Sequence, residues 1–488
     1  MTISRRGFLS VLGGSTLAAA SFGPLLLPRS TQTAELLASR VPLPKPFAVP
    51  LPIPPVAQPT SSDAGGEVYR ITQREADVEI LPGLRTRVLA YDGAFPGPTI
   101  VSRSGRRTTV IHRNELTVPT VVHLHGGHAP ADSDGWPMDL VAPQAERTYT
   151  YPCDQRAATL WYHDHRMDYT GPQVYKGLAG FHLIHDDEDD SLPLPKGERD
   201  IPLMIVDRAF DVDGSLRYPG LANGPGVEDD FMEGVLGDVI LVNGAPWPVL
   251  EVDAARYRLR ILNAANARRF KLTLGAPLVQ IGSDGGLLDK PVSHNDLVVA
   301  PGERYDVVVD FSGYQPGTEL TLHNGFGSGS TADVMRFRVA RRGGDDSRIP
   351  ETLSRIEKLD PAKAVRTREW RFRRGRVHDH EQWLINDAPF DHSGATSAAP
   401  KLGDIEIWRF STDLHHPVHV HLDPFQVVER HGDGPGAYDA GWKDTVDIGP
   451  TNYVDVAVRF TDYTGRYLLH CHNLEHEDMA MMTAFETV

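Results

Sequence analysis

Cysteine is scarce in this chain, with two residues among 488, so at most one disulfide could form. The disulfide-stapled architecture of small exported domains is therefore excluded, and stability must come from hydrophobic cores. Beyond the N-terminal segment, no apolar run is long enough to cross a bilayer, so no membrane span is expected. A chain of this length has room for about three domains of ordinary size.

Positive charge is also in the minority. There are 49 Lys and Arg residues against 65 Asp and Glu residues, which gives a formal net charge of -16 at pH 7. A surface with this excess of negative charge argues against a nucleic-acid partner.

The N-terminus carries a pattern typical of export. Arg5 and Arg6 precede a stretch without charge until Arg29, which is rich in Ala, Gly and Leu and is interrupted by Pro24. Its glycines and proline weaken it as a spanning helix, so it predicts a twin-arginine signal peptide instead. We therefore expect residues 1–45 to form this signal and a proline-rich leader, and the mature protein to be periplasmic or secreted.

The remaining sequence predicts an all-β fold. Short runs rich in β-branched and aromatic residues recur between Gly, Pro and Asp residues, for example 203–206, 257–262 and 454–460. Short strands at this spacing are typical of β-sandwiches. The acidic run 186–190 is interpreted as a solvated linker at a first boundary, and the polar segment 341–366 contains a second boundary.

Ligands of the kind that bind transition metals gather in four segments. Two are His-x-His pairs, one is a run of three histidines, and the last combines histidine, cysteine and methionine. The segments are His123-Leu-His125, His163-Asp-His165, His416-Pro-Val-His419-Val-His421, and His470-Cys471-His472 with His476 and Met481. One His-x-His pair is most often an ordinary strand feature, but four such segments together predict metal binding. A thiolate, two imidazoles and a weak thioether make a blue-copper centre.

Side-chain parity divides these ligands into two sets. Successive side chains on a strand point to opposite faces, so Cys471 faces away from His470 and His472. The same rule separates His416 from His419 and His421. The parity therefore predicts a mononuclear centre around Cys471 and a second centre of eight histidines: His123, His125, His163, His165, His419, His421, His470 and His472. Eight imidazoles are too many for one ion, so the second centre must be polynuclear.

Taken together, these four segments resemble the copper-binding segments of the multicopper oxidases, the laccase-like blue oxidases. The four segments read HLHGG from His123, WYHDH from Trp161, HPVHVH from His416 and HCHNLEHEDMAM from His470. The resemblance implies three cupredoxin-like Greek-key β-sandwich domains. Domains 1 and 3, at residues 46–190 and 365–488, would carry the ligands, while domain 2, at 198–345, has no copper motif and would space the other two.

The resemblance also implies four copper ions and their ligands. The type 1 ion would take His416, Cys471, His476 and axial Met481, and the type 2 ion would take His123 and His419. The type 3 pair would take the remaining six histidines: His125, His163, His165, His421, His470 and His472. Reduction of dioxygen to water needs protons, so a carboxyl group beside the cluster is expected. Asp134 and Glu477 match the acids found there in the family.

The expected function is that of an exported oxidase. It would couple four one-electron oxidations of phenolic or aminophenolic donors to the four-electron reduction of dioxygen. Its partners would be a small-molecule electron donor and dioxygen, and we expect a monomer. The axial Met481 favours a low-to-medium potential, because a thioether lowers the type 1 potential. Leu414-His415 stands where fungal bilirubin oxidases have Trp-Thr, which weakens the bilirubin interpretation.

Two alternatives stay open at this point. A cuprous-ion oxidase usually carries a methionine-rich lid, whereas this chain has nine methionines and no such cluster. A non-catalytic cupredoxin protein, acting as a structural or cell-division factor, would lack the ligands, whereas this chain has all twelve.

Overall fold

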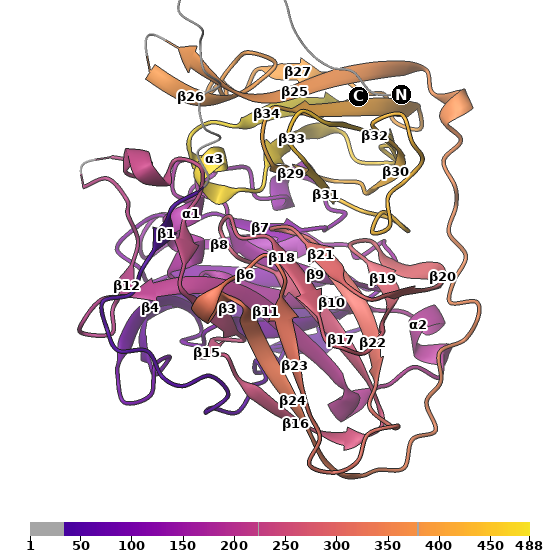
Figure 1. Cartoon of the computed structure of the whole chain (residues 1–488). Helices are drawn as coiled ribbons and strands as arrows, with labels where there is room; N and C mark the ends of the chain where they lie inside the picture. Colours follow the sequence, from indigo (N-terminus) through magenta and orange to yellow (C-terminus); the bar gives the residue numbers. More distant parts are fainter. Residues whose placement is uncertain (1–33, 223, 378–379) are drawn as a thin grey trace, which may run out of the picture. The chain divides into compact units, whose positions relative to one another are not determined.

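Within the residues that the computed structural model describes (34–222, 224–377 and 380–488), the chain is built almost entirely of strands, which confirms the all-β prediction (Figure 1). Seven sheets form in these residues. Six of them belong to three successive two-sheet units, and a small seventh sheet joins β1 (Leu36–Leu37) to β13 (Leu236–Gly237). The predicted signal sequence at residues 1–33 lies outside the described residues. Among the helices of the described part, none combines the length and the apolar character needed to cross a membrane.

The first sandwich has a five-stranded sheet (β2-β3-β6-β8, with β4 beside β3) and a four-stranded sheet (β5-β10-β9-β7). A shared core that includes Tyr69, Val110 and Leu160 lies between them. Its strands are β2 (Ser61–Asp63), β3 (Gly66–Val78), β4 (Thr86–Tyr91), β5 (Gly97–Arg103), β6 (Thr108–Asn114), β7 (Val122–His125), β8 (Glu146–Tyr151), β9 (Ala158–Asp164) and β10 (Ala179–His185).

The middle sandwich has an eight-stranded sheet (β15-β14-β11-β17-β22-β19-β20, with β12 beside β11) and a five-stranded sheet (β16-β24-β23-β18-β21). Its strands are β11 (Asp200–Phe210), β12 (Leu216–Arg217), β14 (Val239–Val242), β15 (Ala245–Pro246), β16 (Val249–Ala254), β17 (Arg256–Asn263), β18 (Phe270–Thr273), β19 (Leu278–Ser283), β20 (Gly286–His294), β21 (Leu297–Val299), β22 (Arg304–Asp310), β23 (Glu319–Asn324) and β24 (Asp333–Arg342). The hydrophobic core of this unit is continuous with Trp161 and Phe181 of the first sandwich.

The third sandwich has two five-stranded sheets, β26-β25-β28-β32-β30 and β27-β34-β33-β29-β31. Alternation explains its core: along β28, Trp408 and Phe410 are buried, while Ile407, Arg409 and Ser411 are partly exposed. Its strands are β25 (Arg366–Val377), β26 (His380–Ile385), β27 (Thr396–Ala398), β28 (Ile405–Thr412), β29 (His416–Val420), β30 (Phe425–Arg430), β31 (Thr445–Ile448), β32 (Tyr453–Arg459), β33 (Gly465–Cys471) and β34 (Met482–Thr487).

Helices are short and lie between strands. The α-helices are α1 (Thr170–Tyr175), α2 (Asp187–Ser191) and α3 (Leu474–Asp478), and the 3-10 helices are η1 (Ala131–Ser133), η2 (Gly197–Arg199), η3 (Asp229–Phe231), η4 (Gly329–Thr331) and η5 (Pro361–Lys363). Helix α2 refines one expectation: Asp187, Glu188 and Asp190 of the acidic run are exposed, as expected of a solvated linker, but the run is helical and Asp189 is buried. Asp186 caps the helix, accepting a bond from the backbone of Asp189, and the Asp189 side chain is buried against Arg258 at 2.8 Å. The sequence pattern gave no sign of this buried cation.

The proline-rich segment 41–59, which continues from the leader into domain 1, packs on two sandwiches as an extended strap. Backbone bonds of 2.8 Å join the N–H of Phe47 and Leu51 to the middle sandwich and the N–H of Ala57 to Thr99 of the first sandwich. Proline fixes an extended backbone, and this suits a segment that crosses from one unit to the other.

Four strands of the first and third sandwiches are buried on both faces, namely β7, β9, β29 and β33. On β7, Val122 and Leu124 point into the core of the first sandwich, so His123 and His125 take the opposite face. On β33, Leu469 and Cys471 belong to the core of the third sandwich, so His470 takes the other face. The histidine faces of these strands meet where the first and third sandwiches touch.

Candidate metal centres

A three-donor site lies inside the third sandwich. The Sγ of Cys471 is 3.4 Å from Nδ1 of His416 and 3.6 Å from Nδ1 of His476, and the two nitrogens are 3.2 Å apart. Three donors around one ion, with bonds of about 2.0–2.3 Å, are separated by about 3.5–4 Å in trigonal geometry. The triangle therefore has nearly the size that a single metal ion requires.

Met481 lies beside this triangle and is fully buried. Its N–H bonds the carbonyl of His476 at 2.9 Å, and its carbonyl accepts from the N–H of Cys471 at 3.0 Å. Through these two bonds the chain turns back after α3, and Met481 enters the core of the third sandwich next to Cys471.

The outward nitrogens of the two imidazoles are held by polar neighbours. Nε2 of His416 lies 3.1 Å from Oδ1 of Asp413, and Nε2 of His476 lies 3.2 Å from Nδ2 of Asn473. Such partners fix the orientation of a ligand ring and leave its other nitrogen free for a metal. Asp413 is about one-third exposed, so the edge of the His416 ring is one residue away from solvent.

An aromatic ring packs against both imidazoles of this site. Trp383 of β26 stacks on His476, with ring centroids 3.7 Å apart and planes inclined by 27°. It also meets the edge of His416 at 5.6 Å, and the guanidinium of Arg374 lies over its outer face at 5.7 Å. The site is thus shielded by a buried indole as well as by the core.

Helix α3, which carries His476, is anchored to the other two sandwiches. The carboxylate of Glu475 accepts from Asn266 Nδ2 at 2.8 Å and from Tyr218 OH at 3.0 Å, both in the middle sandwich. The carboxylate of Asp478 accepts from the first backbone N–H groups of α1, Thr170 and Gly171, at 2.8 Å each. Figure 1 shows α3 beside α1. The position of His476 is therefore set by all three units.

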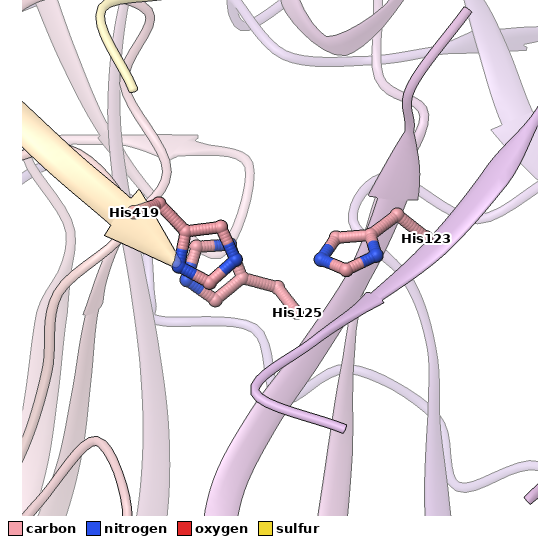
Figure 2. A group of neighbouring side chains, drawn as sticks. All are labelled: His123, His125 and His419. Carbon is pink, nitrogen blue, oxygen red and sulfur yellow. The ribbon is translucent and has the colours of Figure 1, made fainter. Parts of the chain in front are cut away.

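The second site consists of eight buried histidines, four from the first sandwich and four from the third. Their nitrogens form three neighbouring groups: His123, His125 and His419; His125, His163 and His472; His165, His421 and His470. Rings from the two sandwiches interleave. His125 and His419 stack at 3.7 Å with planes inclined by 13°, and Figure 2 shows these two rings overlapping with His123 facing them. His123 stacks on His421 at 3.9 Å.

Backbone and side-chain acceptors hold one nitrogen of most of these rings. Nδ1 of His123, His163 and His419 lies 2.5–2.9 Å from the backbone carbonyls of Asp134, Asp164 and Asp444. Their Nε2 atoms then face inward and have no hydrogen-bond partner among the described residues. His125 is reversed, because its Nε2 is bonded and its Nδ1 is unpartnered. A buried nitrogen without a partner is costly, so this inward set of donors fits metal ions.

Burial keeps these imidazoles neutral. It lowers the pKa of His163 to about 3 and of His165 to about 4, and it holds the pKa of His123, His125, His421 and His472 well below the usual value. Neighbouring imidazoles add to the effect. A neutral imidazole is the form that ligates a metal, so the cluster is ready for cations at neutral pH.

The two acids predicted from the sequence both lie against the cluster. Oδ2 of Asp134 is 2.8 Å from Nδ1 of His421, and the carboxylate of Glu477 lies between Nδ1 of His165 at 3.5 Å and Nδ1 of His470 at 3.3 Å. Burial raises the pKa of Asp134 well above its usual value. Burial also opposes ionisation of Glu477, but the facing His165 and His470 outweigh it and lower the pKa of Glu477.

A cavity of about 460 Å³ reaches the cluster at the junction of the sandwiches. Its wall includes His123 and His421 of the cluster together with His128, Asp423 and Trp442. A small molecule such as dioxygen, or several waters, fits this volume.

Several residues at these sites escaped the sequence analysis. Asp444 and Thr445 bond cluster histidines, and Trp161 stacks on His163 at 4.2 Å. Trp161 lies in the WYHDH segment, two residues before His163 and on the same face of the strand, so the period of two could have predicted this contact. Asp444 lies more than 20 residues from any predicted ligand, and no spacing rule points to it.

Comparison with known proteins places this chain in a family. Three family models described as multicopper oxidase match residues 72–189, 222–327 and 359–488. Together they cover most of the sequence, one for each sandwich. The chain belongs to the multicopper oxidase family, and its three sandwiches are the cupredoxin-like domains that the resemblance implied.

Within that family the chain is a laccase-like oxidoreductase. It is 36% identical to a laccase of Bacillus stratosphericus over 91% of this chain and 99% of that protein. It is 35% identical to a bilirubin oxidase of Albifimbria verrucaria over 98% of this chain and 87% of that protein. The crystal structure of a laccase from Pediococcus acidilactici matches with a TM-score of 0.84 at 32% identity, covering 93% of this chain and 96% of that one.

Proposed function

We propose that this protein is an exported oxidase that couples four one-electron oxidations of small phenolic or aminophenolic donors to the reduction of dioxygen to two waters. The observation that carries the proposal is Cys471. Its thiol belongs to the three-donor site, while the residues on both sides, His470 and His472, belong to the eight-histidine site. One continuous stretch of covalent backbone thus joins a mononuclear centre to a polynuclear one.

The donor sets support four copper ions. Type 1 copper would be held by His416, Cys471, His476 and Met481, because two nitrogens, a thiolate and a thioether are the blue-copper set. Type 2 copper would be held by His123 and His419. The type 3 pair would be held by two groups of three imidazoles: His125, His163 and His472, and His165, His421 and His470. When bound, the coppers would supply one-electron redox chemistry at the first site and dioxygen reduction at the second.

The protein's own groups would organise this chemistry. The buried core around Cys471 excludes water from the thiolate, while Asp413 gives the ring edge of His416 a polar contact that a donor hydroxyl could share. Asp134, whose pKa is raised, would hold a proton at Oδ1 while its Oδ2 accepts from the Nδ1–H of His421. Glu477, whose pKa is lowered by the facing His165 and His470, would take up a proton and pass it on. Both acids face the cluster that the cavity reaches, and this position supports a role in proton transfer to oxygen during its reduction.

We also propose the remaining assignments. Domains at 46–190, 198–345 and 365–488 are supported by the grouping of the sheets and by the three matched segments. The twin-arginine motif supports export to the periplasm or the medium. We further propose a monomer that takes small-molecule donors at the three-donor site. The cuprous-ion alternative would need a methionine-rich site. Met479 and Met482 flank Met481, but Met479 packs against a hydrophobic core and Met482 lies within one, which favours a packing role for both.

Copper loading tests the proposal directly. The purified full-length protein, loaded with copper, should be blue and should bind about four ions per chain. Cys471→Ser should be colourless and should keep the ions of the eight-histidine site. A colourless wild type with full copper uptake, or a blue Cys471→Ser variant, would contradict the assignment.

The donor class needs a second measurement. Oxygen consumption with a dimethoxyphenol, an aminophenol, bilirubin and cuprous ion should show turnover of the phenol and aminophenol, with four donors oxidised for each dioxygen. Turnover of cuprous ion alone would establish the alternative activity instead.

A further inference from the structure

A buried group of charges connects the middle sandwich to the eight-histidine site. Asp284, Glu303 and Arg304 come from the middle sandwich, and Lys443 and Asp444 come from the third. All five side chains are at most 4% exposed. Lys443 Nζ lies 3.0 Å from Asp284 and 3.1 Å from Glu303. Burying this many charges is unfavourable unless each is paired, so the group forms one interdependent unit.

Arg304 occupies the centre of this unit and uses every donor that a guanidinium has. Nη1 and Nη2 donate to the two carboxylate oxygens of Asp444 at 2.7 and 2.5 Å. The other three donors bond the carbonyls of Thr159, Gly302 and Asp284 at 3.0, 3.0 and 3.2 Å. These partners come from all three sandwiches. A lysine has neither the planar fork nor the five donors, so it cannot reproduce this arrangement.

Asp444 and its neighbour Thr445 pass this restraint on to two cluster histidines. Oδ1 of Asp444 lies 3.1 Å from Nε2 of His125, and the Asp444 carbonyl lies 2.9 Å from Nδ1 of His419. The hydroxyl of Thr445 contacts the same two nitrogens at 3.1 and 3.2 Å. His125 and His419 are the stacked pair in Figure 2, one from each outer sandwich.

The orientation of His125 depends on these contacts. Its Nε2 is bonded outward to Asp444 and Thr445, so its Nδ1 faces inward, whereas His123, His163 and His419 present Nε2. A ring turned by half a revolution would withdraw that donor from its group. Outer partners of this kind commonly set ring orientation and metal affinity.

We propose that Arg304 is a positioning residue for the trinuclear copper site. It fixes Asp444, which fixes the rings of His125 and His419. The middle domain, predicted from the sequence to be a spacer, is on this view part of the metal-binding apparatus although it supplies no ligand to the described cluster. The inference rests on the proposed trinuclear site.

The test compares copper retention in full-length, copper-loaded Arg304→Met and wild type. Chelator competition should show copper at the eight-histidine site bound about 10- to 100-fold more weakly in the variant. The type 2 signal in electron paramagnetic resonance should broaden or shift, while the blue absorption of the Cys471 site stays unchanged. Arg304→Lys should give a defect in the same direction.

Arg258→Met is the matched control. Arg258 is also buried and also joins two sandwiches, bonding Asp189 and Asp306, but it contacts neither Asp444 nor a cluster histidine among the described residues. The Arg258→Met variant should have a lower unfolding temperature than the wild type and the same copper signals. Equal copper loss in Arg258→Met would reduce the effect of Arg304 to general loosening and overturn the proposal.

A milder variant covers the case in which Arg304→Met fails to fold. Thr445→Val removes only the hydroxyl shared by His125 and His419, so it should fold and should shift the type 2 signal in the same direction. The inference is wrong if Thr445→Val and Arg304→Lys both show the wild-type type 2 signal and retain copper against the chelator as the wild type does. If the wild type binds no copper at the eight histidines, the proposed function is wrong, and the inference about Arg304 depends on that function.

Discussion

The two candidate metal sites differ in how the chain builds them. All four residues proposed for the mononuclear centre belong to one sandwich, and three lie within residues 471–481. The eight histidines of the second centre are shared equally by two sandwiches, and their outer contacts extend into the third. The first site is therefore a local property of one domain, whereas the second exists only when domains are docked. Helix α3 qualifies the contrast, because Glu475 and Asp478 tie the helix of His476 to both other units.

Removal of one ligand from each site should separate them most strongly. His416→Ala should bleach the blue colour and leave copper at the eight histidines, while His419→Ala should keep the blue colour and lose the type 2 ion. Both changes should abolish turnover, because each interrupts one half of the coupled reaction. Absorption, electron paramagnetic resonance and copper analysis of the two variants check this. Loss of the colour in both would show that the sites are not built independently.

Replacing Glu477 with Gln should act on the oxygen-reducing site alone. The amide keeps the shape of the side chain but can neither take up a proton nor pass it on, and proton transfer of this kind is worth about 100-fold or more in rate. Reoxidation of the fully reduced enzyme by dioxygen should slow, and the blue absorption should stay. Glu475→Gln, in the same helix but facing the middle sandwich, is the control. An unchanged reoxidation rate in Glu477→Gln removes this acid from the mechanism.

Asp478→Ala should weaken the docking of α3 on the first sandwich. The change leaves the N–H groups of Thr170 and Gly171 without their acceptor in a buried place, which costs about 2–4 kcal/mol. Denaturant unfolding measures the loss. Copper at the eight histidines should become easier to extract than copper at the Cys471 site, since docking matters more to the shared centre. Equal extraction from both sites would show that the eight-histidine site does not depend on domain docking more than the Cys471 site does.

Trp383→Phe should tune the mononuclear centre and leave the other unaffected. The indole stacks on His476, and aromatic pairs of this type contribute about 0.5–1.5 kcal/mol, so the reduction potential should shift by tens of millivolts. Redox titration of the blue absorption measures it. A smaller ring keeps most of the core filled, so the unfolding temperature serves as the control. No shift in potential would mean that the stacking does not distinguish the two oxidation states.

The smallest effect concerns pH. His128 of the first sandwich lies 3.1 Å from Asp423 and 2.9 Å from Asp462 of the third. Burial alone would lower the pKa of His128, but the two carboxylates outweigh it and raise the pKa. Protonated His128 therefore stabilises the junction fully below its unfolded pKa of about 6.5, and the contribution disappears as the pH rises through the folded pKa. His128→Gln should cost on the order of 1 kcal/mol at pH 5 and less at pH 8, measured by unfolding. Equal costs at both pH values would exclude this role.

Much of the arrangement could be predicted because strands obey a period of two. Alternation along 416–421 and 470–472 requires no tertiary information, and it separates Cys471 from its histidine neighbours. The same reasoning cannot find Arg304 or Asp444. Their bond joins residues 140 positions apart through the packing of two domains, and neither lies in a repeated pattern. Likewise, nothing near Asp189 in the sequence indicates that Arg258 will bury it.

The five-charge unit has a consequence for protein engineering and for descent. Asp284, Glu303 and Arg304 form ion pairs with Lys443 and Asp444 across a boundary between domains, so each half depends on the other to pair its buried charges. A chimaera that took its central module from another oxidase would inherit an unpaired lysine or aspartate in a dry interior unless both halves were transplanted together. Modules of such enzymes are thus not freely interchangeable parts, even where the exchanged one holds no metal ligand.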